Sequence, residues 1–506
     1  MKTRLLTLLG LALMAALPLA FAQGGGTLRV SLSSDPTSLF MPRTADRTAT
    51  NAAWPLYDSL VFIDDEGNVV PMLATDWTVS DDGTEYVFHL REGVTFHNGA
   101  PFTSADVIAT WETGSDDSND YSGQYQMAET VEAIDDYTVR ITTAEPNALF
   151  FTTLANDWAI VPHEYIGELG LDAFAQDPIG TGPFQYVSRV AGDRIVYERN
   201  DDYWQEDLPY LDGVEFRVIP DPSTRMAAIQ TGSIDIANRL TADQVGVLEN
   251  ASGVEIVTYL NDRVYYVAFK NIGSGEGTPL EDARVRQALN YGLDRFGINE
   301  AIFSGQANAA PGFIVEGNLG YDADTMQPFP YDPERAVELL EEAGYPDGFE
   351  IVMGCPADGY ININEVCQAI SSSLAGIGVE VDVDFQTTNT FWSEPRYAVT
   401  GPMYVDSWSS EVGEALPRLE GALTPGNYYN TWEDERIADL ILQIEQEVDR
   451  EARAELYQEM HDLMREDPPF IYLYQPVIFE AINENLVGYA PRPAEDYFLH
   501  SVRFDD

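Results

Sequence analysis

The stretch "YVFHLREGVTFHNGAPFTSADVIATWE", residues 86–112, contains a strand, a turn and a helix in one short segment. Apolar residues alternate with other residues at its start, which predicts a half-buried strand. Asn98 and Gly99 form a typical turn pair that ends this pattern. Thr103 then stands at the expected helix N-cap, with Asp106 three residues later in the place of a capping box. The segment therefore predicts a strand followed by a capped helix.

Two of the five histidines lie in this stretch, and a shared metal site is the alternative to consider. His89 falls on the polar side of the expected strand, and His97 adjoins the turn. Exposed or hydrogen-bonded structural roles are the more common fate of such residues. We therefore expect no metal site here.

The N-terminal segment has the pattern of a secretory signal peptide. Lys2 and Arg4 precede an apolar run that ends in a small-x-small motif, which predicts cleavage between Ala22 and Gln23. A membrane anchor is the alternative, but the run is short for a bilayer span. We expect an exported protein of the periplasm or extracytoplasmic space, because no later apolar run is long enough to span a membrane.

The chain is strongly acidic, with 84 Asp and Glu residues against 27 Lys and Arg residues and a formal net charge of −57. A field of this sign repels phosphate backbones and anionic membranes, so we expect no nucleic-acid partner. An acidic surface also suits a protein that stays soluble in concentrated salt, where long-range electrostatic steering is screened. A saline habitat is therefore a hypothesis.

Cys355 and Cys367 are the only cysteines. In an oxidising compartment they could form a disulfide that closes a short loop. Two buried thiols, which behave as small apolar groups, are the alternative. The spacing is not that of a metal site, because there is no CxxC motif and no nearby histidine.

The rest of the chain alternates strand and helix patterns, which indicates an α/β fold. We expect a hairpin around residues 191–193, a helix over 282–295, and another that begins after Asp332 with Pro333 in its first turn. A helix near 366–374 leads to a strand over 379–385. The C-terminal strand residues are expected to rejoin the opening sheet, since termini commonly lie on one domain.

No motif for catalysis is present: the chain contains no GxSxG, GxxxxGK[ST], GxGxxG or HExxH sequence. Aromatic residues are instead dense near residue 400. Such residues form the walls of ligand clefts, but they also fill cores, and both readings stay open. The group consists of Phe391, Trp392, Tyr397, Tyr404 and Trp408.

Several long segments carry a family resemblance. They are "LATDWTVSDDGTEYVFHLREGVTFHNGAPFTSADV" (73–107), "PIGTGPFQYVSRVAGDRIVYERNDDYW" (178–204), "IPDPSTRMAAIQTGSIDIA" (219–237), "DARVRQALNYGLDR" (282–295) and "YDPERAVELLEEAGYPDG" (331–348). In this order they resemble the extracytoplasmic solute-binding proteins of peptide/nickel-class ABC importers, that is, solute-binding protein family 5 of the oligopeptide and dipeptide type. The resemblance covers nearly all of the chain after the signal segment.

The resemblance implies an α/β fold of the two-lobed periplasmic-binding-protein type, class II-like, with three domains and a ligand cleft between the lobes. Hinge closure would capture the ligand in that cleft. The boundaries that we assign are 1–22 for the signal peptide, 23–58, 179–268 and 478–506 for the segments of domain I, 59–178 for domain II and 269–477 for domain III.

The resemblance also suggests where the cargo binds. In peptide-binding members an acidic residue that follows a Trp holds the α-ammonium of the peptide. The matching segment here is "MYVDSWSSEVGE", in which Trp408 corresponds to that Trp. Three residues later the chain has Glu411, where peptide binders have Asp. A sugar could use the same Trp for stacking. The nickel-binding specialists fit less well, because this region has no His. The other candidate binding residues are Tyr404, Asp406, Ser409, Trp392 and Asp46.

The expected function is that of a non-enzymatic receptor, which captures a short peptide and delivers it to the permease subunits of an ABC importer. An oligosaccharide, an opine or another small solute is the alternative cargo, and a secreted hydrolase is a remote alternative. We expect no cofactor and a monomeric protein.

Overall fold

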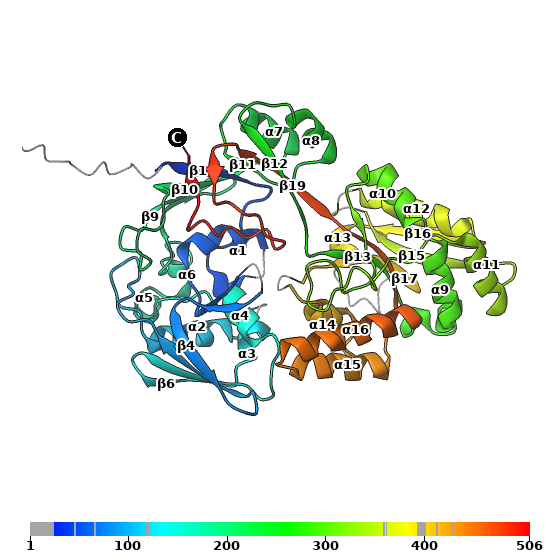
Figure 1. Cartoon of the computed structure of the whole chain (residues 1–506), viewed down its shortest axis with the longest axis horizontal. Coiled ribbons are helices and arrows are strands. Elements are labelled where there is room, and N and C mark those ends of the chain that lie inside the picture. Colours follow the sequence, from blue (N-terminus) through cyan, green and yellow to red (C-terminus); the bar gives the residue numbers. More distant parts are fainter. Residues whose placement is uncertain are drawn as a thin grey trace, which may run out of the picture.

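The computed structural model describes residues 25–44, 47–64, 67–117, 119, 122–357, 360, 362–391, 401–410, 413–427 and 429–505. The chain forms two lobes, and both ends of the described chain lie in the first of them (Figure 1). The expected signal peptide and its cleavage site at Ala22 and Gln23 lie outside the described residues. Within those residues, no helix is long and apolar enough to cross a membrane.

The first lobe is built on a seven-stranded mixed sheet that uses both ends of the chain. Strand β1 runs parallel to β10 and β11, whereas β19 pairs antiparallel with β11 and β12, so the C-terminal strand rejoins the opening sheet. The expected hairpin is β8 and β9. In sheet order the strands are β12 (Val254–Leu260), β19 (Val477–Asn483), β11 (Ile236–Ala237), β1 (Thr27–Leu32), β10 (Gly213–Val218), β9 (Arg194–Arg199) and β8 (Phe184–Val190).

Short helices cover this sheet, and α1 lies on the side that faces the second lobe (Figure 1). Helix α7 begins where Asp221 accepts a hydrogen bond from the backbone N–H of Thr224, as an N-cap should. The helical elements here are α1 (Arg47–Ala53), α5 (His163–Leu169), α6 (Leu171–Phe174), α7 (Pro222–Gln230) and α8 (Ala242–Leu248); a small pair, β20 (Leu486–Val487) and β21 (Arg503–Phe504), lies near the C-terminus.

The stretch 86–112 belongs to a second, four-stranded antiparallel sheet in the same lobe, of order β4-β5-β7-β6. Its strand buries alternate residues as expected, and the Thr103 N–H donates to Asp106 Oδ2 over 2.8 Å in a capping box. The elements are β2 (Val61–Ile63), β3 (Val69–Pro71), β4 (Ala74–Val79), β5 (Glu85–Leu90), α2 (Ser104–Gly114), α3 (Gly123–Gln126), β6 (Thr130–Asp135), β7 (Thr138–Thr142) and α4 (Phe150–Asn156).

The two histidines of this stretch have separate structural partners. His89 is exposed and contacts Asp76 over 2.6 Å. His97 accepts a hydrogen bond at Nδ1 from the backbone N–H of Gly180 and contacts the carbonyl oxygen of Gly182 through Nε2, at 3.2 and 3.0 Å. Burial lowers the pKa of His97 to about 4, so it stays neutral. Both residues thus have hydrogen-bond partners within the first lobe.

Asp58 joins the segment before β2 to the segments on either side of the β8–β9 hairpin. Its carboxylate is fully buried and accepts hydrogen bonds from the hydroxyls of Thr181 and Tyr203 and from the indole N–H of Trp204, at 2.9 to 3.0 Å. A buried carboxylate needs such donors, because an unsatisfied charge is costly in the interior.

The second lobe contains a six-stranded mixed sheet with helices on both sides (Figure 1). In sheet order its strands are β14 (Asn308–Ala309), β18 (Phe470–Gln475), β13 (Val264–Phe269), β17 (Met403–Trp408), β15 (Phe349–Pro356) and β16 (Val379–Gln386). Its helices are α9 (Ala283–Gly292), α10 (Arg295–Phe303), α11 (Pro333–Glu342), α12 (Ile363–Ala375), α13 (Thr388–Phe391), α14 (Leu416–Leu423), α15 (Glu435–Gln446) and α16 (Arg450–Glu466).

The helix expected over 282–295 is shorter than predicted. It ends at Gly292, because Leu293 adopts an extended backbone and Asp294 caps a new helix by accepting from the N–H of Gly297. The helix after Asp332 begins with Pro333, as expected, and Asp332 accepts from the N–H of Arg335.

Cys355 and Cys367 form a disulfide between β15 and α12, with their Cα atoms 6.5 Å apart. Both residues are fully buried in the core of the second lobe. The bond therefore fastens a helix to the strand beneath it.

We predict that the double substitution Cys355→Ser and Cys367→Ser lowers the free energy of unfolding by about 3 kcal/mol, because a closed loop of this length restricts the unfolded chain. Urea unfolding monitored by circular dichroism measures the change, with the wild type under non-reducing conditions as reference. A loss well below about 1 kcal/mol contradicts the entropic account.

Candidate functional site

The two lobes are joined by two crossings of the chain that lie side by side. Strand β12 leads into β13 through residues 261–263, and β18 leads into β19 through Pro476. The N–H of Asn261 donates to the carbonyl of Pro476 over 3.0 Å, and Gln475 Nε2 donates to the carbonyl of Asn261 over 2.9 Å. Two adjacent crossings form a hinge, since a few residues can absorb the rotation of one lobe against the other.

Charged side chains from both lobes meet at Asp262 in this hinge. Arg47 of the first lobe donates to both carboxylate oxygens at 3.2 Å. Arg418 of the second lobe is fully buried and donates to the backbone carbonyl of Asp262 over 2.7 Å. Burial lowers the pKa of Arg418 to about 10, so the side chain remains charged at neutral pH.

The lobes touch again on the side away from the hinge. The N–H of Ala148 donates to the carbonyl of Glu445 at the end of α15, over 2.8 Å. Nearby, the guanidinium of Arg450 lies against Gly67. The facing surfaces between these two contacts form the candidate site.

The wall contributed by the second lobe is the end of β17. Trp408 lies opposite Val264, so this strand ends beside the hinge. Arg263 Nη1 donates to the hydroxyl of Ser407 over 2.9 Å. Strand β17 pairs with β13 along its whole length but with β15 only at Met403 and Tyr404. Among the described residues, no strand pairs with the other edge of β17 beyond that point.

Tyrosines line the same end of the second lobe. The rings of Tyr265 and Tyr474 stack with centroids 4.7 Å apart, and Tyr360 meets Tyr265 edge-on at 5.4 Å. Burial raises the pKa of Tyr265, and the charges of Arg263 and of Arg239 oppose that rise. Since Arg239 belongs to the first lobe, its charge acts across the boundary between the lobes.

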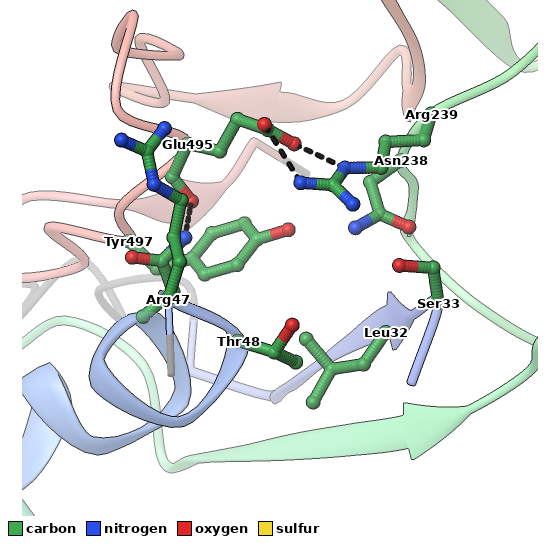
Figure 2. Close-up of a pocket in the computed structure, with 9 residues that line it drawn as sticks. Leu32, Ser33, Arg47, Thr48, Asn238, Arg239, Glu495 and Tyr497 are labelled. Atoms are coloured by element: carbon green, nitrogen blue, oxygen red, sulfur yellow. Dashed lines mark hydrogen bonds and ion pairs between the residues drawn. The ribbon is translucent and has the colours of Figure 1, made fainter. Parts of the chain in front are cut away.

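A small pocket, partly open to solvent, lies in the wall of the first lobe (Figure 2). In it Arg239 donates from Nε and Nη2 to the two carboxylate oxygens of Glu495, over 2.6 and 2.9 Å. Nine residues from four separate segments line the pocket: Leu32, Ser33, Arg47, Thr48, Asn51, Asn238, Arg239, Glu495 and Tyr497.

Two lobes, a paired hinge and facing polar walls are the architecture of a solute-binding protein. The profile described as "Bacterial extracellular solute-binding proteins, family 5 Middle" matches residues 68–430. The chain belongs to this family. The expected fold, the family and the role of solute receptor for an ABC importer are thereby established.

Known family 5 proteins are similar along almost the whole chain. The glutathione-binding protein GsiB of Escherichia coli K12 is 29% identical over 498 residues, which cover 95% of each chain. The structure of HbpA2 from Haemophilus parasuis has a TM-score of 0.86 at 25% identity, over 95% of this chain and 100% of that one. The oligopeptide-binding protein AppA of Bacillus subtilis, solved with a nonapeptide, has a TM-score of 0.76 at 26% identity, over 96% and 100%.

Trp408 of this family 5 protein is half-buried and held from two sides. Its ring meets that of Tyr429 nearly at right angles, with centroids 4.8 Å apart. A Cβ atom on Gly421 of α14 would lie 2.3 Å from the indole Cη2 and Cζ2 atoms, so the ring edge sits directly on the helix. The absence of a side chain at residue 421 therefore sets the position of the indole.

Some of the other predicted binding residues lie in or next to β17, and others lie outside the described residues. Tyr404 and Asp406 are 2% exposed; the Tyr404 hydroxyl lies 3.3 Å from that of Thr431, and Asp406 accepts from the N–H of Ser407. Ser409 is half-buried immediately after β17. The structure thus places Tyr404, Asp406 and Trp408 along β17 and Ser409 directly after it, whereas Trp392, Glu411 and Asp46 lie outside the described residues.

Sequence reasoning did not single out the arginines of the two walls, namely Arg47, Arg239 and Arg263. Their partners are far away in the chain: Arg239 and Glu495 are 256 positions apart. The sequence did offer one signal: cations are scarce in this acidic chain, so each arginine is a candidate for a specific role.

We predict that Gly421→Ala displaces the Trp408 indole and weakens cargo binding at least tenfold without removing any cargo contact. The new methyl group would overlap the ring edge. Tryptophan fluorescence reports the displacement, and a thermal-shift assay with cargo reports the loss. Gly246→Ala in α8 is the matched control, because its Cβ would meet nothing within 4 Å. Equal behaviour of the two variants contradicts this prediction.

Glu420, next to Gly421 in α14, has a side-chain carboxyl group whose pKa is raised. Burial, and then the charge of Glu445, raises its pKa to about 8. Burial also raises the pKa of Glu445, whose carbonyl makes the contact between the lobes. The folded protein therefore holds a proton at Glu420 over a range of pH in which the unfolded chain has released it.

We predict that Glu420→Gln stabilises the protein at pH 8 and flattens the fall in stability between pH 5 and pH 8. A raised carboxyl pKa means that folded protein binds more protons in this window, so the free energy of unfolding decreases as pH rises. Chemical denaturation at a series of pH values measures the slope. Glu459→Gln, at an exposed position of α16, is the control. A slope identical to that of the wild type would refute the assignment.

Proposed function

We propose that the protein captures a short peptide between its lobes and, once closed, delivers it to the permease subunits of an ABC importer. The observation that carries this proposal is the end of β17, where Ser407 and Trp408 lie beside the hinge, beyond Met403 and Tyr404, which pair with β15. An extended peptide can add to an open strand edge as a further strand, with main-chain hydrogen bonds supplying affinity.

The surroundings of this strand suit a peptide. Trp408 offers apolar contact area at its end, and the half-buried Ser409 offers a hydroxyl that can orient a polar backbone. Two relatives support the same cargo class, because AppA was solved with a nonapeptide and GsiB is named for glutathione, itself a tripeptide. Boundaries at residues 58 and 178 remain our proposal for the division within the first lobe. The boundary expected at 268 falls inside β13 of the second lobe, so we place the division between the lobes at residues 261–263 and at Pro476.

Closure follows from the position of the site between the lobes. A peptide held on β17 meets the pocket of Arg239 only when the lobes are together, so binding favours the closed form. The permease would then recognise a surface that spans both lobes. We also infer an exported, monomeric receptor that works without a cofactor and carries out no catalysis.

An oligosaccharide, an opine or another small solute is the alternative cargo, since the indole of Trp408 could stack on a sugar ring. A secreted hydrolase is disfavoured, because the sequence contains none of the nucleophile motifs and the relatives are binding proteins. Mass spectrometry of material that co-purifies from the native host distinguishes these possibilities. Recovery of sugars or opines instead of peptides overturns the peptide proposal.

We predict that Trp408→Ala weakens peptide binding at least tenfold, or about 1.4 kcal/mol. The substitution removes the apolar contact at the end of β17 while leaving its backbone edge in place. Isothermal titration with a peptide identified by mass spectrometry measures the effect. Trp77→Ala, at a half-buried position of β4 in the first lobe, controls for the loss of a tryptophan. Unchanged affinity in a folded Trp408 variant removes this residue from the site.

A further inference from the structure

Three short segments form the contact between the lobes on the side away from the hinge. Residues 80–83 and 145–148 belong to the first lobe, and residues 445–451, which span the connection between α15 and α16, belong to the second (Figure 1). Their sequences are "SDDG", "EPNA" and "EQEVDRE", so acidic residues lie on both sides of the contact. Arg450 is the one basic residue in these segments.

The atoms that touch across this contact are uncharged. The hydrogen bond from Ala148 to Glu445 joins two backbone groups. A Cβ atom on Gly83 would lie 3.3 Å from Pro146 Cβ and 3.6 Å from Val448 Cγ1, so apolar groups of both lobes meet at this glycine. Hydrogen bonds and dispersion act only at near-contact distances, so these interactions hold the lobes together once they have met.

The carboxylates beside these atoms carry charges that no cation pairs with. Asp81, Asp82 and Glu145 are exposed on the first lobe, and Asp449 and Glu451 are exposed on the second. In the described part of the chain none of the five forms an ion pair. Asp82 accepts from the hydroxyl of a neighbouring serine, and Asp449 accepts from backbone N–H groups of α16, and both kinds of donor are neutral. Like charges repel, so the approach of the lobes at this contact costs free energy.

Arg450 acts in the opposite direction. Its guanidinium group reaches the first lobe at Gly67, where a Cβ atom would lie only 2.6 Å from Nη2. Gly67 is in the turn between β2 and β3, and its N–H donates to the carbonyl of Asp64 over 2.9 Å. Among the described residues Arg450 takes part in no ion pair, so its positive charge attracts the acidic face of the first lobe as a whole.

Salt acts differently on the two kinds of interaction. The Debye length is about 10 Å at 0.1 M ionic strength and about 3 Å at 1 M. Concentrated salt therefore screens the repulsion between exposed carboxylates across the contact, whereas the backbone hydrogen bond and the apolar contact remain. Because the contact lies away from the hinge, a rotation of the lobes about the hinge separates these segments.

We propose that this contact makes closure of the lobes depend on salt. In dilute solution the carboxylates of residues 80–83, 145–148 and 445–451 oppose closure, and screening by salt removes this opposition. Arg450 offsets part of the repulsion. In concentrated salt a larger fraction of the empty receptor is then closed, so less of the free energy of cargo binding is needed for closure.

The test measures the distance between the lobes in the protein without cargo. Both native cysteines are in the disulfide, so fluorescent dyes can be attached to cysteines introduced by Thr78→Cys in β4 and Leu442→Cys in α15, both at exposed positions. Single-molecule energy transfer should show the ratio of short-distance to long-distance molecules rise at least threefold between 0.1 and 1 M NaCl. KCl should act equally, because screening depends on ionic strength. Circular dichroism verifies the fold at each concentration.

Matched variants locate the effect. Glu145→Gln with Glu447→Gln removes one carboxylate from each side and should at least double the ratio at 0.1 M salt while leaving it unchanged at 1 M. Glutamine keeps the acceptor that Glu447 offers to a backbone N–H. Arg450→Gln should lower the ratio at 0.1 M salt. Glu380→Gln with Asp382→Asn removes two exposed carboxylates from β16, at the edge of the second-lobe sheet, and should behave like the wild type.

A ratio that stays constant or falls as salt rises overturns the proposal, as does an equal response in all three variants. A response to NaCl but not to KCl also overturns it, since that result indicates a specifically bound ion. No ligand is present in these measurements, so none of these outcomes bears on the peptide proposal, which mass spectrometry tests separately.

Discussion

The structure depends on one constraint: the chain passes between the lobes at a single place. The two crossings are hydrogen-bonded to each other through Asn261, Gln475 and Pro476. Beside them Asp262 connects an arginine of the first lobe with the fully buried Arg418 of the second. Removing one partner of such a group leaves an uncompensated buried charge, which is strongly destabilising. The lobes can therefore rotate about this point, whereas separating them there would strongly destabilise the protein.

The candidate site follows from the same arrangement. Because β13 starts and β17 ends at the hinge, Val264 and Trp408 lie at the end of the sheet next to the crossings, and Trp408 is the one residue of β17 that is not buried. Arg239, Glu495 and Asn261 continue the hydrogen-bonded network from the hinge into the pocket. A contiguous set of hydrogen bonds thus connects the pocket with the hinge.

Local patterns predicted much of the fold. The strand, turn and capped helix of residues 86–112, the hairpin around 191–193 and the helix after Asp332 depend on periodicity and on caps within a few residues. The sequence did not predict that the helix ends at Gly292, because no apolar pattern indicates the second helix, which Asp294 caps. For the site, Trp408 and Ser409 could be proposed from the sequence. Arg239 and Arg263 could not, since their partners Glu495 and Ser407 lie 256 and 144 positions away.

The adjacency of the two crossings also makes the second lobe an inserted module. The chain leaves the first lobe after Asn261 and returns at Pro476, one backbone hydrogen bond away. A segment whose ends meet can be removed, replaced or circularly permuted with little strain on the remainder, because a short linker can close the gap. The same geometry favours engineering: a reporter domain inserted near either crossing would sense the angle between the lobes, so this fold offers a direct route to an optical sensor for its cargo.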